Sequence, residues 1–459
     1  MTKNTWLLAA CSLVIACTSD GAPQAEVAPK ADQYLQALGD SGMFSGTVLL
    51  ARGGKTLFVK GYGFADSESR VPNTAATRFP IASITKTFTA TVVLQLQKRG
   101  ALAITDPACQ YIDPCPAAWR EITIRHLLMH TAGLPNYTGI PDFENRNHAP
   151  VTPAEIVALF RDLPLEFAPG TKYRYSNSGY YLLGAIIEKV SGKPYAAVLE
   201  EFIFKPLGMK DSGYDANAGT SPRPASGYQP DGADNAKAPI VDASWIYAAG
   251  GIYSTVEDLL RWERALTTDA LLPAQELAAM WAADLGEYGY GWQLLPPSPK
   301  TQNRRLVFHA GGIPGFATDL LRYPDERVTI IILANLHPVN LNDMSRALGS
   351  IMFGESFSMP PVRRAVRVDP DIYDEYVGRY AINPSVALHV TRENDKLVVQ
   401  ATGQPGDIAV PESEVTFYSR IHPARLTFVK DASGKVGKLI IHDPQRDIPA
   451  TKMVPGTDF

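Results

Sequence analysis

A lysine opens one of the most apolar helical stretches of the sequence. Residues 81–100 read IASITKTFTATVVLQLQKRG, and after Lys86 no charged residue appears until Lys98. Because apolar side chains occupy nearly every direction around such a helix, we expect the helix to be buried. Burying an ammonium group without a partner costs several kcal/mol. Lys86 therefore needs a physical reason to stand at this position.

Ser83 lies three residues before Lys86 and offers that reason. Residues three apart at the start of a helix share one face, so the lysine amine can reach the serine hydroxyl. A buried lysine loses part of its affinity for protons, and a neutral amine can remove a proton from a hydroxyl. By itself Ser-x-x-Lys is expected about once by chance in a chain of this length. A structural lysine that reaches a carbonyl or a carboxylate is the alternative interpretation.

Two further motifs follow in an informative order. KYRYSNSGYYLLG contains Tyr175 and Asn177, and RLVFHAGGIPGF contains His309, Gly311 and Gly312 at the end of a strand-like run. Ser-x-x-Lys, then Tyr-x-Asn, then Lys- or His-x-Gly is the motif order of the penicillin-recognising serine hydrolases. The three motifs together are highly specific, although each is weak alone.

From about residue 31 to residue 355 the chain resembles the serine β-lactamase-like superfamily. The resemblance is closest to class C β-lactamases, DD-peptidases, D-aminopeptidases and related esterases, and HLLMHTAGLP and AAGGIYSTVEDLLRW agree with it. It implies an α/β (α+β) β-lactamase/transpeptidase-like domain with an antiparallel sheet packed by helices. It also implies a serine hydrolase that works through an acyl-enzyme.

The resemblance gives each motif residue a role. Ser83 would be the nucleophile, and Lys86 and Tyr175 would activate it and pass its proton to the leaving group. We expect the ammonium to make the Tyr175 phenol easier to ionise, and the sequence leaves open which of the two is the ground-state base. Asn177 would orient Lys86 and the amide of the substrate.

The third motif would hold the oxyanion and the substrate. The backbone N–H groups of Ser83 and Gly312 would bind the developing oxyanion, and glycine at 311 and 312 would permit close approach. His309 stands where many relatives carry lysine, and Ala310 where relatives that grip a carboxylate carry Thr or Ser. These departures favour an esterase, amidase or aminopeptidase acting on small or D-configured acyl groups over a carboxypeptidase or a potent β-lactamase.

The composition and the remaining motifs exclude other classes of function. The net charge of −4 provides no basic face for a nucleic acid. Nucleotide-binding loops and the Gly-x-Ser-x-Gly elbow are missing, so phosphoryl-transfer, NAD and α/β-hydrolase chemistry lack their motifs. His126 and His130 lack the acidic partner of a zinc motif, and we expect them to pack in the core, with no metal and no cofactor.

The N-terminus has the features of an export signal. A short cationic start precedes the apolar run WLLAACSLVIAC, and Val14 to Cys17 resembles a bacterial lipobox. We therefore predict a lipoprotein signal peptide at 1–17, with Cys17 as the lipidated first mature residue and 18–30 as a tether. Cys11 is a poorer match, and a plain signal peptide cut near Ala22 is the alternative. The prediction places the protein outside the bacterial cytoplasm, in the periplasm or anchored to a membrane by its lipid alone.

Cys109 and Cys115 remain once the leader cysteines are set aside. They stand close together in ITDPACQYIDPCPAAW, a proline-rich loop that would lie outside the reducing cytosol. A disulfide is the natural interpretation, because two cysteines alone make a poor metal site.

The rest of the chain predicts two folded units. Strand-like runs at both ends of 31–358, with helical patterns between them, predict one antiparallel sheet packed by helices, and Gly53-Gly54 suits a hairpin turn. The proline-rich segment 359–370 predicts a linker. About eight short strand-like runs in 371–459 predict a small all-β barrel that resembles the lipocalin-like domains of some relatives. Such a barrel would hold a small ligand or be filled by side chains.

The sequence thus supports two functional hypotheses. The first is a secreted serine hydrolase that cleaves peptide, amide or ester bonds of small or D-amino-acid-containing substrates through Ser83. The second is a catalytically silent, penicillin-binding-like protein that binds peptidoglycan fragments or a small ligand. We prefer the first because all three motifs are intact, and we expect the barrel to shape or cover the entrance to the Ser83 cleft. The oligomeric state is not predicted.

Overall fold

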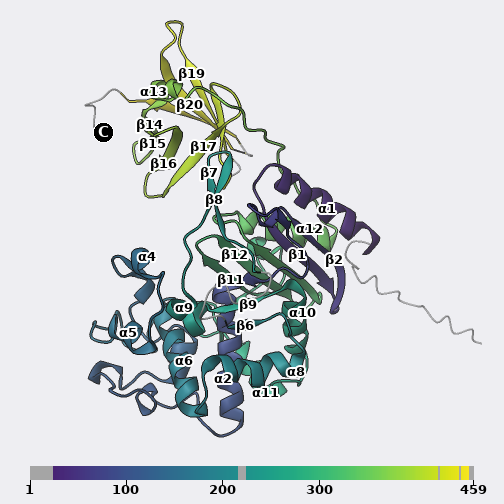
Figure 1. Ribbon diagram of the computed structural model, residues 1–459, viewed down its shortest axis with the longest axis vertical. Helices are drawn as coiled ribbons and strands as arrows, with labels where there is room; N and C mark the ends of the chain where they lie inside the picture. The colour runs from purple at the N-terminus through teal and green to yellow at the C-terminus, as the bar shows by residue number, and fades with distance from the viewer. Residues whose placement is uncertain (1–23, 215–223, 422–423, 444–445, 454–459) are drawn as a thin grey trace, which may run out of the picture.

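The central sheet is assembled from two distant parts of the chain, as predicted. The computed structural model describes residues 24–214, 224–421, 424–443 and 446–453 (Figure 1). Six strands pair in the order β10-β11-β12-β13-β1-β2, and each neighbouring pair is antiparallel. The strands are β1 (Gly46–Arg52), β2 (Lys55–Tyr62), β10 (Gln293–Leu295), β11 (Leu306–Ile313), β12 (Phe316–Tyr323) and β13 (Val328–Ala334).

Helices cover both faces of this sheet. Helix α1 (Gln24–Asp40) and helix α12 (Leu341–Phe353) pack together on one face and form one apolar core with the strands beneath. On the other face lie α2 (Thr85–Lys98) and α10 (Val256–Ala265) with a larger core. Both β12 and β13 are buried along their whole length, and the near-continuous apolar sequence of β13 follows from this double cover.

The N-terminal helix begins earlier than the sequence suggested. We predicted a tether at 18–30, but its last seven residues are helical, because α1 starts at Gln24. Val27, Ala31 and Leu35 are all buried, so the apolar stripe with helical spacing extends into a segment whose composition resembles a linker. Cys17 and the predicted signal peptide lie outside the described residues.

The buried helix predicted from the sequence is α2. A short 3-10 turn, Ala82–Ile84, precedes it, and all residues from Thr85 to Leu96 are buried. The other elements of this domain are mostly short helices and two- to four-residue strands. They are α3 (Ile124–Leu128), α4 (Phe143–Arg146), α5 (Pro153–Ala158), α6 (Asn177–Ser191), α7 (Tyr195–Leu199), α8 (Lys205–Leu207), α9 (Ala243–Gly250), α11 (Ala274–Met280), β3 (Phe64–Asp66), β4 (Val71–Pro72), β5 (Phe79–Pro80), β6 (Gly213–Tyr214), β7 (Tyr228–Asp231), β8 (Asp234–Lys237) and β9 (Ile252–Ser254).

The predicted disulfide is present in the helical half of this domain. Cys109 and Cys115 are bonded to each other, and both pack against the larger core. Within the described ranges, no helix combines the length and the hydropathy that crossing a bilayer requires.

The C-terminal domain is a closed eight-stranded barrel, which confirms the predicted all-β architecture. Consecutive strands pair antiparallel and the last strand pairs with the first. Aromatic side chains fill its interior: Tyr376, from helix α13 (Tyr373–Tyr376), stacks on Phe428 with ring centroids 4.2 Å apart. The strands are β14 (Gly378–Asn383), β15 (Val386–Glu393), β16 (Lys396–Ala401), β17 (Gly406–Pro411), β18 (Thr416–Tyr418), β19 (Arg425–Lys430), β20 (Val436–His442) and β21 (Asp447–Lys452).

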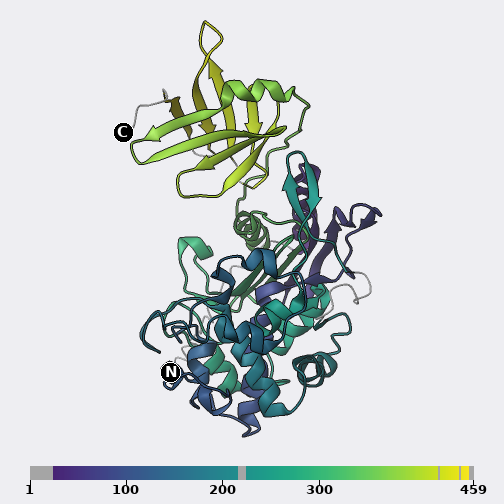
Figure 2. The same ribbon diagram turned by 60° about the vertical axis from the view of Figure 1, so that its left-hand side comes forward.

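A hairpin of the first domain reaches to the barrel. Strands β7 and β8 project from the sheet domain toward the barrel in both views (Figures 1 and 2). Arg420 of the barrel donates a hydrogen bond of 2.7 Å to Asn235 Oδ1 in this hairpin, and Lys396 pairs with Asp231. The segment between α12 and Pro370, which includes the predicted linker, contains neither helix nor strand.

Candidate active site

The turn before α2 presents Ser83 to a cleft. Its predecessor Ala82 has φ +45°, a left-handed conformation that costs about 1–3 kcal/mol for a residue with a Cβ. Two hydrogen bonds hold this strained turn on the sheet: Ile81 N–H donates to Ile252 O (2.9 Å), and Thr318 Oγ donates to Ile81 O (3.0 Å). The strain therefore falls next to the side chain predicted to be the nucleophile.

Lys86 lies beneath Ser83 and is completely buried. Its Nζ is 3.0 Å from Ser83 Oγ, 2.8 Å from Asn177 Oδ1 and 2.7 Å from Ala249 O. All three partners are uncharged, and among the described residues no ion pair joins Lys86 to a carboxylate. Burial lowers the pKa of Lys86 well below its ordinary value.

The neighbours of Lys86 fix the direction of its hydrogen bond with Ser83. A neutral amine has two hydrogens and one lone pair. The oxygens of Asn177 and Ala249 can only accept, so they take both hydrogens. In the neutral form of Lys86 the lone pair would then face Ser83, and the serine hydroxyl would donate to it. The geometry suits proton transfer from the serine to the lysine.

Tyr175 completes the surroundings of the serine hydroxyl. Its Oη donates to Ser83 Oγ at 3.0 Å, and Lys86 Nζ lies 4.9 Å from the centre of its ring. Our expectation that the phenol would ionise easily is wrong, because burial raises the pKa of Tyr175 above its ordinary value. Tyr175 is therefore arranged as a proton donor.

Asn177 is the first residue of α6 and joins two parts of the site. Its side-chain oxygen accepts from Lys86, and its Nδ2 donates to Thr138 Oγ1 at 3.1 Å. Its backbone N–H donates to Asn136 Oδ1 at 3.0 Å. The sequence analysis missed the supporting roles of Asn136 and Thr138, since nothing in the sequence relates them to a residue about forty positions away.

His309 is held from both sides behind the cleft. Its Nδ1 donates to Ala310 O at 2.7 Å, so in the neutral ring Nε2 accepts from Tyr288 Oη at 2.9 Å. Burial lowers the pKa of His309 to about 3. The imidazole is neutral, which agrees with our expectation that it would hold a substrate carboxylate poorly. Tyr288 carried no signal in the sequence.

The two glycines after His309 differ in their surroundings. A Cβ on Gly311 would lie 2.5 Å from Ile81 O, so only glycine lets β11 pack against the turn that carries Ser83. A Cβ on Gly312 would meet only His337 Nε2, at 3.6 Å. Packing within the protein therefore requires glycine at 311, whereas Gly312 is exposed to the cleft. That glycine at both positions lets a substrate approach closely stays a prediction.

The cleft itself has a volume of about 190 Å³ and brings three predicted residues together. Ser83, Asn177 and Gly312 line it, and Gly312 lies next to the free end of the β11–β12 hairpin. The backbone of Gly312 is thus available beside the serine, where the oxyanion of an attacked carbonyl would form.

Comparison with known proteins assigns the fold. Residues 31–349 match the model of the family described as Beta-lactamase. The chain belongs to the Beta-lactamase family. Residues 362–453, which hold the barrel, match a domain of unknown function. The match and the serine–lysine–tyrosine geometry make the chain a serine hydrolase of the β-lactamase type.

Several relatives cover most of the chain. Penicillin-binding protein 4* of Bacillus subtilis is 32% identical over 86% of this chain and 92% of its own length. A D-stereospecific amidohydrolase from Streptomyces sp. is 28% identical, with a TM-score of 0.61 over 72% of this chain and 99% of its own. A D-amino acid amidase from Ochrobactrum anthropi is 28% identical, with a TM-score of 0.56 over 66% and 92% of the two chains.

Two histidines of the HLLMHTAGLP segment support the β-lactamase domain. His126 caps α3 through its Nδ1, which accepts from Thr123 N–H, but it is only partly buried, so our expectation of core packing is wrong for this residue. His130 packs its ring 4.2 Å from that of Tyr175, and its Nδ1 accepts from Ser176 N–H. The fully buried His130 ring thus positions Tyr175. In the part of the chain that the structure describes, no group of three or more His, Cys, Asp or Glu residues is arranged for a metal.

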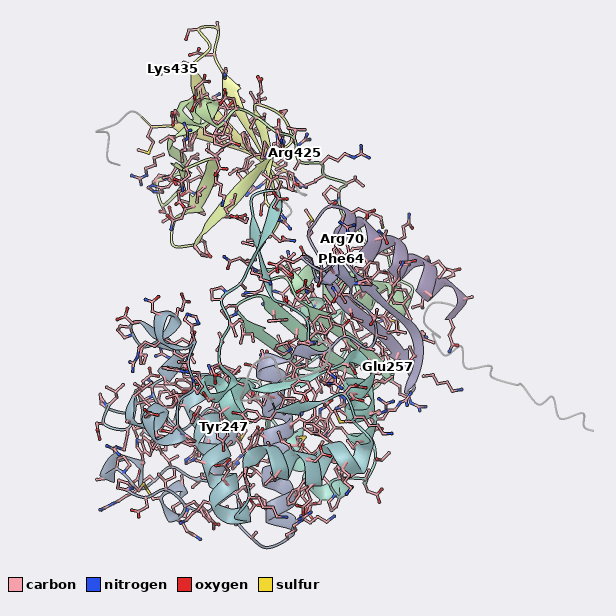
Figure 3. The ribbon with its side chains drawn as sticks, viewed as in Figure 1. Phe64, Arg70, Tyr247, Glu257, Arg425 and Lys435 are labelled. Carbon is pink, nitrogen blue, oxygen red and sulfur yellow. A yellow bond between two sulfur atoms is a disulfide. The ribbon has the colours of Figure 1, made fainter. Side chains whose placement is uncertain are left out.

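A second strained residue, Tyr247, positions the backbone carbonyl that accepts a hydrogen bond from Lys86. Tyr247 has φ +37° and ψ −127°, which breaks α9 just before Ala248 and Ala249. Both of these carbonyls then accept from α2: Ala248 O from Thr89 Oγ and Ala249 O from Lys86. Figure 3 shows Tyr247 within the helical half of the domain. Since the acceptor is a backbone atom, no residue type at 249 could have predicted it.

Proposed function

We propose that this protein is a secreted hydrolase that cleaves amide or ester bonds of small D-amino-acid-containing substrates through an acyl-enzyme on Ser83. One observation supports this most strongly: the buried Lys86 lies within hydrogen-bond distance of Ser83 Oγ, Asn177 Oδ1 and Ala249 O, and none of these partners is a carboxylate. A lysine that only filled the core would not need this arrangement.

The first half of the reaction forms the acyl-enzyme. Lys86 takes the proton of Ser83 as Oγ attacks the substrate carbonyl, and the backbone N–H groups of Ser83 and Gly312 hold the resulting oxyanion. Tyr175 donates its proton to the leaving nitrogen or oxygen as the bond to the carbonyl carbon breaks. The proton on Lys86 then returns to Tyr175.

The second half hydrolyses the acyl-enzyme. Water gives one proton to the same Lys86–Tyr175 pair, its oxygen attacks the ester carbonyl, and Ser83 Oγ leaves with a proton. The carboxylic acid is released, and the hydroxyl and the amine return to their initial states. The same two groups thus serve both steps.

The site favours substrates that are uncharged, or that are cleaved at their amino-terminal residue, over substrates that present a C-terminal carboxylate. His309 is neutral and hydrogen-bonded within the protein, so it supplies no cation at the position where many relatives carry lysine. Two structural relatives at 28% identity are a D-stereospecific amidohydrolase and a D-amino acid amidase. These similarities support small D-configured amides or related esters as substrates.

Export is also part of the proposal. The N-terminal sequence resembles a lipoprotein signal with Cys17 as the modified residue, and the disulfide of Cys109 and Cys115 suits an oxidising compartment. Cell fractionation with a Cys17→Ser variant tests this part. We expect the wild-type chain in the membrane fraction and the variant released from it, and a cytoplasmic wild-type chain would contradict export.

Labelling of the serine separates the hydrolase from the silent binding protein. We expect a small fluorophosphonate to add one adduct, mapped by mass spectrometry to Ser83, and we expect Ser83→Ala to remain unlabelled. Ser191→Ala, which removes a half-buried serine at the end of α6, is the control and should label normally. An unlabelled wild-type chain would favour the binding protein. Rates with D-aminoacyl anilides, p-nitrophenyl esters and nitrocefin would then rank the substrates.

A further inference from the structure

A second cavity opens beside the catalytic cleft. It has a volume of about 340 Å³, within the roughly 300–1,000 Å³ usual for small-molecule sites. Five residues line both spaces, so the two cavities lie side by side along a shared wall. The shared residues are Val241, Ile246, Gly250, Ile313 and Pro314.

The walls of this cavity are mainly hydrocarbon. Pro80, Ile252 and Phe316 line it from the sheet side, and Ala238 and Ile240 line it from the segment that follows β8. Ile240 is 68% exposed and lies at the rim of the cavity. The cavity therefore offers apolar contact to a group that enters from the Ser83 cleft.

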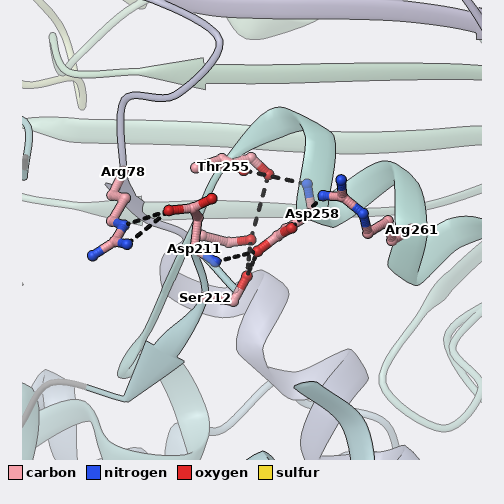
Figure 4. A network of polar contacts seen from close by, with 7 residues as sticks. Arg78, Asp211, Ser212, Thr255, Asp258 and Arg261 are labelled. Atoms are coloured by element: carbon pink, nitrogen blue, oxygen red, sulfur yellow. Dashed lines mark hydrogen bonds and ion pairs between the residues drawn. The ribbon is translucent and has the colours of Figure 1, made fainter. Parts of the chain in front are cut away.

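The two cations of the wall are neutralised by the protein itself. Arg78 Nη2 lies 2.7 Å from Asp211 Oδ1, and Lys237 Nζ lies 2.7 Å from Glu68 Oε2. Figure 4 shows the first pair within a network that continues to Asp258, which accepts from the Asp211 backbone. Neither cation is thus set up to receive a carboxylate.

We propose that this cavity binds an uncharged hydrocarbon side chain carried by the acyl part of the substrate. The proposal rests on the hydrolase function and narrows its substrate class to hydrophobic acyl groups, such as those of aliphatic or aromatic amino acids. Burial of one methylene group is worth about a fourfold gain in kcat/KM. A short acyl group would leave the cavity empty and lose this gain.

A series of p-nitrophenyl esters with acyl chains of increasing length tests the proposal. We expect kcat/KM to rise about fourfold per methylene until the cavity is filled, and then to fall. Ile240→Asp places a carboxylate at the rim of the cavity. It should lower kcat/KM for the preferred chain length at least tenfold and so flatten the dependence of kcat/KM on chain length. Val362→Asp changes an apolar residue of similar exposure in the linker and is the matched control.

The rate of labelling by the fluorophosphonate distinguishes a failure of the cavity proposal from a failure of the proposed hydrolase function. If all variants label at Ser83 but the wild-type chain shows no dependence on acyl length, the cavity proposal fails and the hydrolase function stands. The same failure follows if Ile240→Asp and Val362→Asp have equal profiles. If the wild-type chain does not label, the hydrolase function itself fails.

A separate set of contacts gives the barrel a role in this site. None of the described residues that line the cleft or the cavity belongs to the barrel, so its predicted position over the cleft has no support there. Arg420 of the barrel is 5% exposed and reaches the β7–β8 hairpin, donating to Asp234 O and Asn235 Oδ1, and it also donates to Gly42 O. Residues 238–241 follow this hairpin directly in the chain and form part of the cavity wall.

We infer that the barrel positions the wall of the cavity by holding the hairpin. Lys396, which pairs with Asp231 at the turn of the same hairpin, acts together with Arg420. Removing both side chains should let the wall shift and weaken selection among acyl chains without changing the serine chemistry. Arg420 and Lys396 are thus positioning residues, remote from the reacting atoms.

The double variant Arg420→Ala/Lys396→Ala tests this inference. We expect KM for the preferred long-chain ester to rise about tenfold, while kcat for the acetate ester and the fluorophosphonate rate stay unchanged. Arg392→Ala, which removes ion pairs within the barrel domain, is the control and should leave the profile intact. An unchanged profile in the folded double variant would overturn the inference. If the double variant misfolds, the single variant Lys396→Ala replaces it. This variant loses only the partly exposed ion pair with Asp231, and KM for the long-chain ester again decides.

Discussion

Two buried cations in the β-lactamase domain have opposite surroundings. Arg322 on β12 donates to Glu263 Oε1 at 3.1 Å and lies 4.9 Å from the ring centre of Trp281. Lys86 on α2 reaches only a hydroxyl, an amide oxygen and a backbone carbonyl. Both side chains are almost fully buried, so the partners alone distinguish them.

The difference separates a structural cation from a chemical one. The carboxylate of Glu263 offsets much of the cost of burying Arg322, which keeps its charge. Nothing comparable offsets the cost for Lys86, and burial lowers the pKa of this group well below its ordinary value. The fold therefore gives up stability to keep a base beneath Ser83. Each prediction below changes one side of this comparison.

Lys86→Met should produce the largest effect, on activity. Loss of the base should lower kcat/KM for any ester or amide by at least about 10³-fold, whereas the free energy of unfolding should stay equal or rise, because methionine fills the site without a polar group. Ester hydrolysis and urea unfolding measure the two effects. A variant that is less stable than the wild type by several kcal/mol would show that Lys86 is a structural residue.

Arg322→Met should do the reverse. Removing one partner of a buried pair leaves the Glu263 carboxylate unpaired and should lower the free energy of unfolding by about 3–5 kcal/mol. The fluorophosphonate rate per folded molecule should not change. The double variant Arg322→Met/Glu263→Leu removes both charges and should recover much of the loss in urea unfolding. No recovery would mean that packing, and not the ion pair, is responsible.

The stability of the wild type should depend on pH through Lys86. The unfolded chain binds a proton at Lys86 below about pH 10.4, and the folded protein holds the amine neutral to a lower pH. Because the unfolded state binds more protons in this interval, the free energy of unfolding of the wild type rises with pH relative to Lys86→Met, by up to about 1.4 kcal/mol per unit. Urea unfolding at several pH values measures the difference. A constant difference from about pH 7 to 10 would contradict a lowered pKa.

Tyr288→Phe should have the smallest effect. The change removes the hydrogen bond to His309 Nε2, worth about 1 kcal/mol, and should lower kcat/KM about fivefold. The rate should remain independent of pH near 6.5, since His309 is neutral in both proteins. An acid limb at that pH that vanishes in His309→Gln would show that His309 titrates during the reaction.

The sequence predicted the parts of the molecule that follow from local patterns. The sheet strands, the buried α2, the disulfide and the eight-stranded barrel all rest on periodicity, turn residues or cysteine context. The start of α1 at Gln24 was not predicted, because Val27 is a single apolar residue in a segment whose composition resembles that of a linker. The motifs also indicated which side chains converge at Ser83.

The sequence could not give the protonation states, because these depend on burial and on distant acceptors. Ala249 O fixes the hydrogen bonds of Lys86, yet a carbonyl is present at every position of a chain. His130 and Tyr288 act through ring and hydroxyl contacts with residues far away in sequence. The β7–β8 hairpin has a polar sequence without clear alternation, so its contact with the barrel also appears only in the structure.

The rate of Ser83 phosphonylation as a function of pH tests the central claim most directly. If a neutral Lys86 is the base, the rate rises to a plateau with a midpoint well below the value of about 10.4 for an exposed lysine. The midpoint should be the same in Tyr175→Phe, because the Tyr175 phenol does not ionise in this range. A midpoint near 10 that shifts in Tyr175→Phe would contradict the claim and make the phenolate the base.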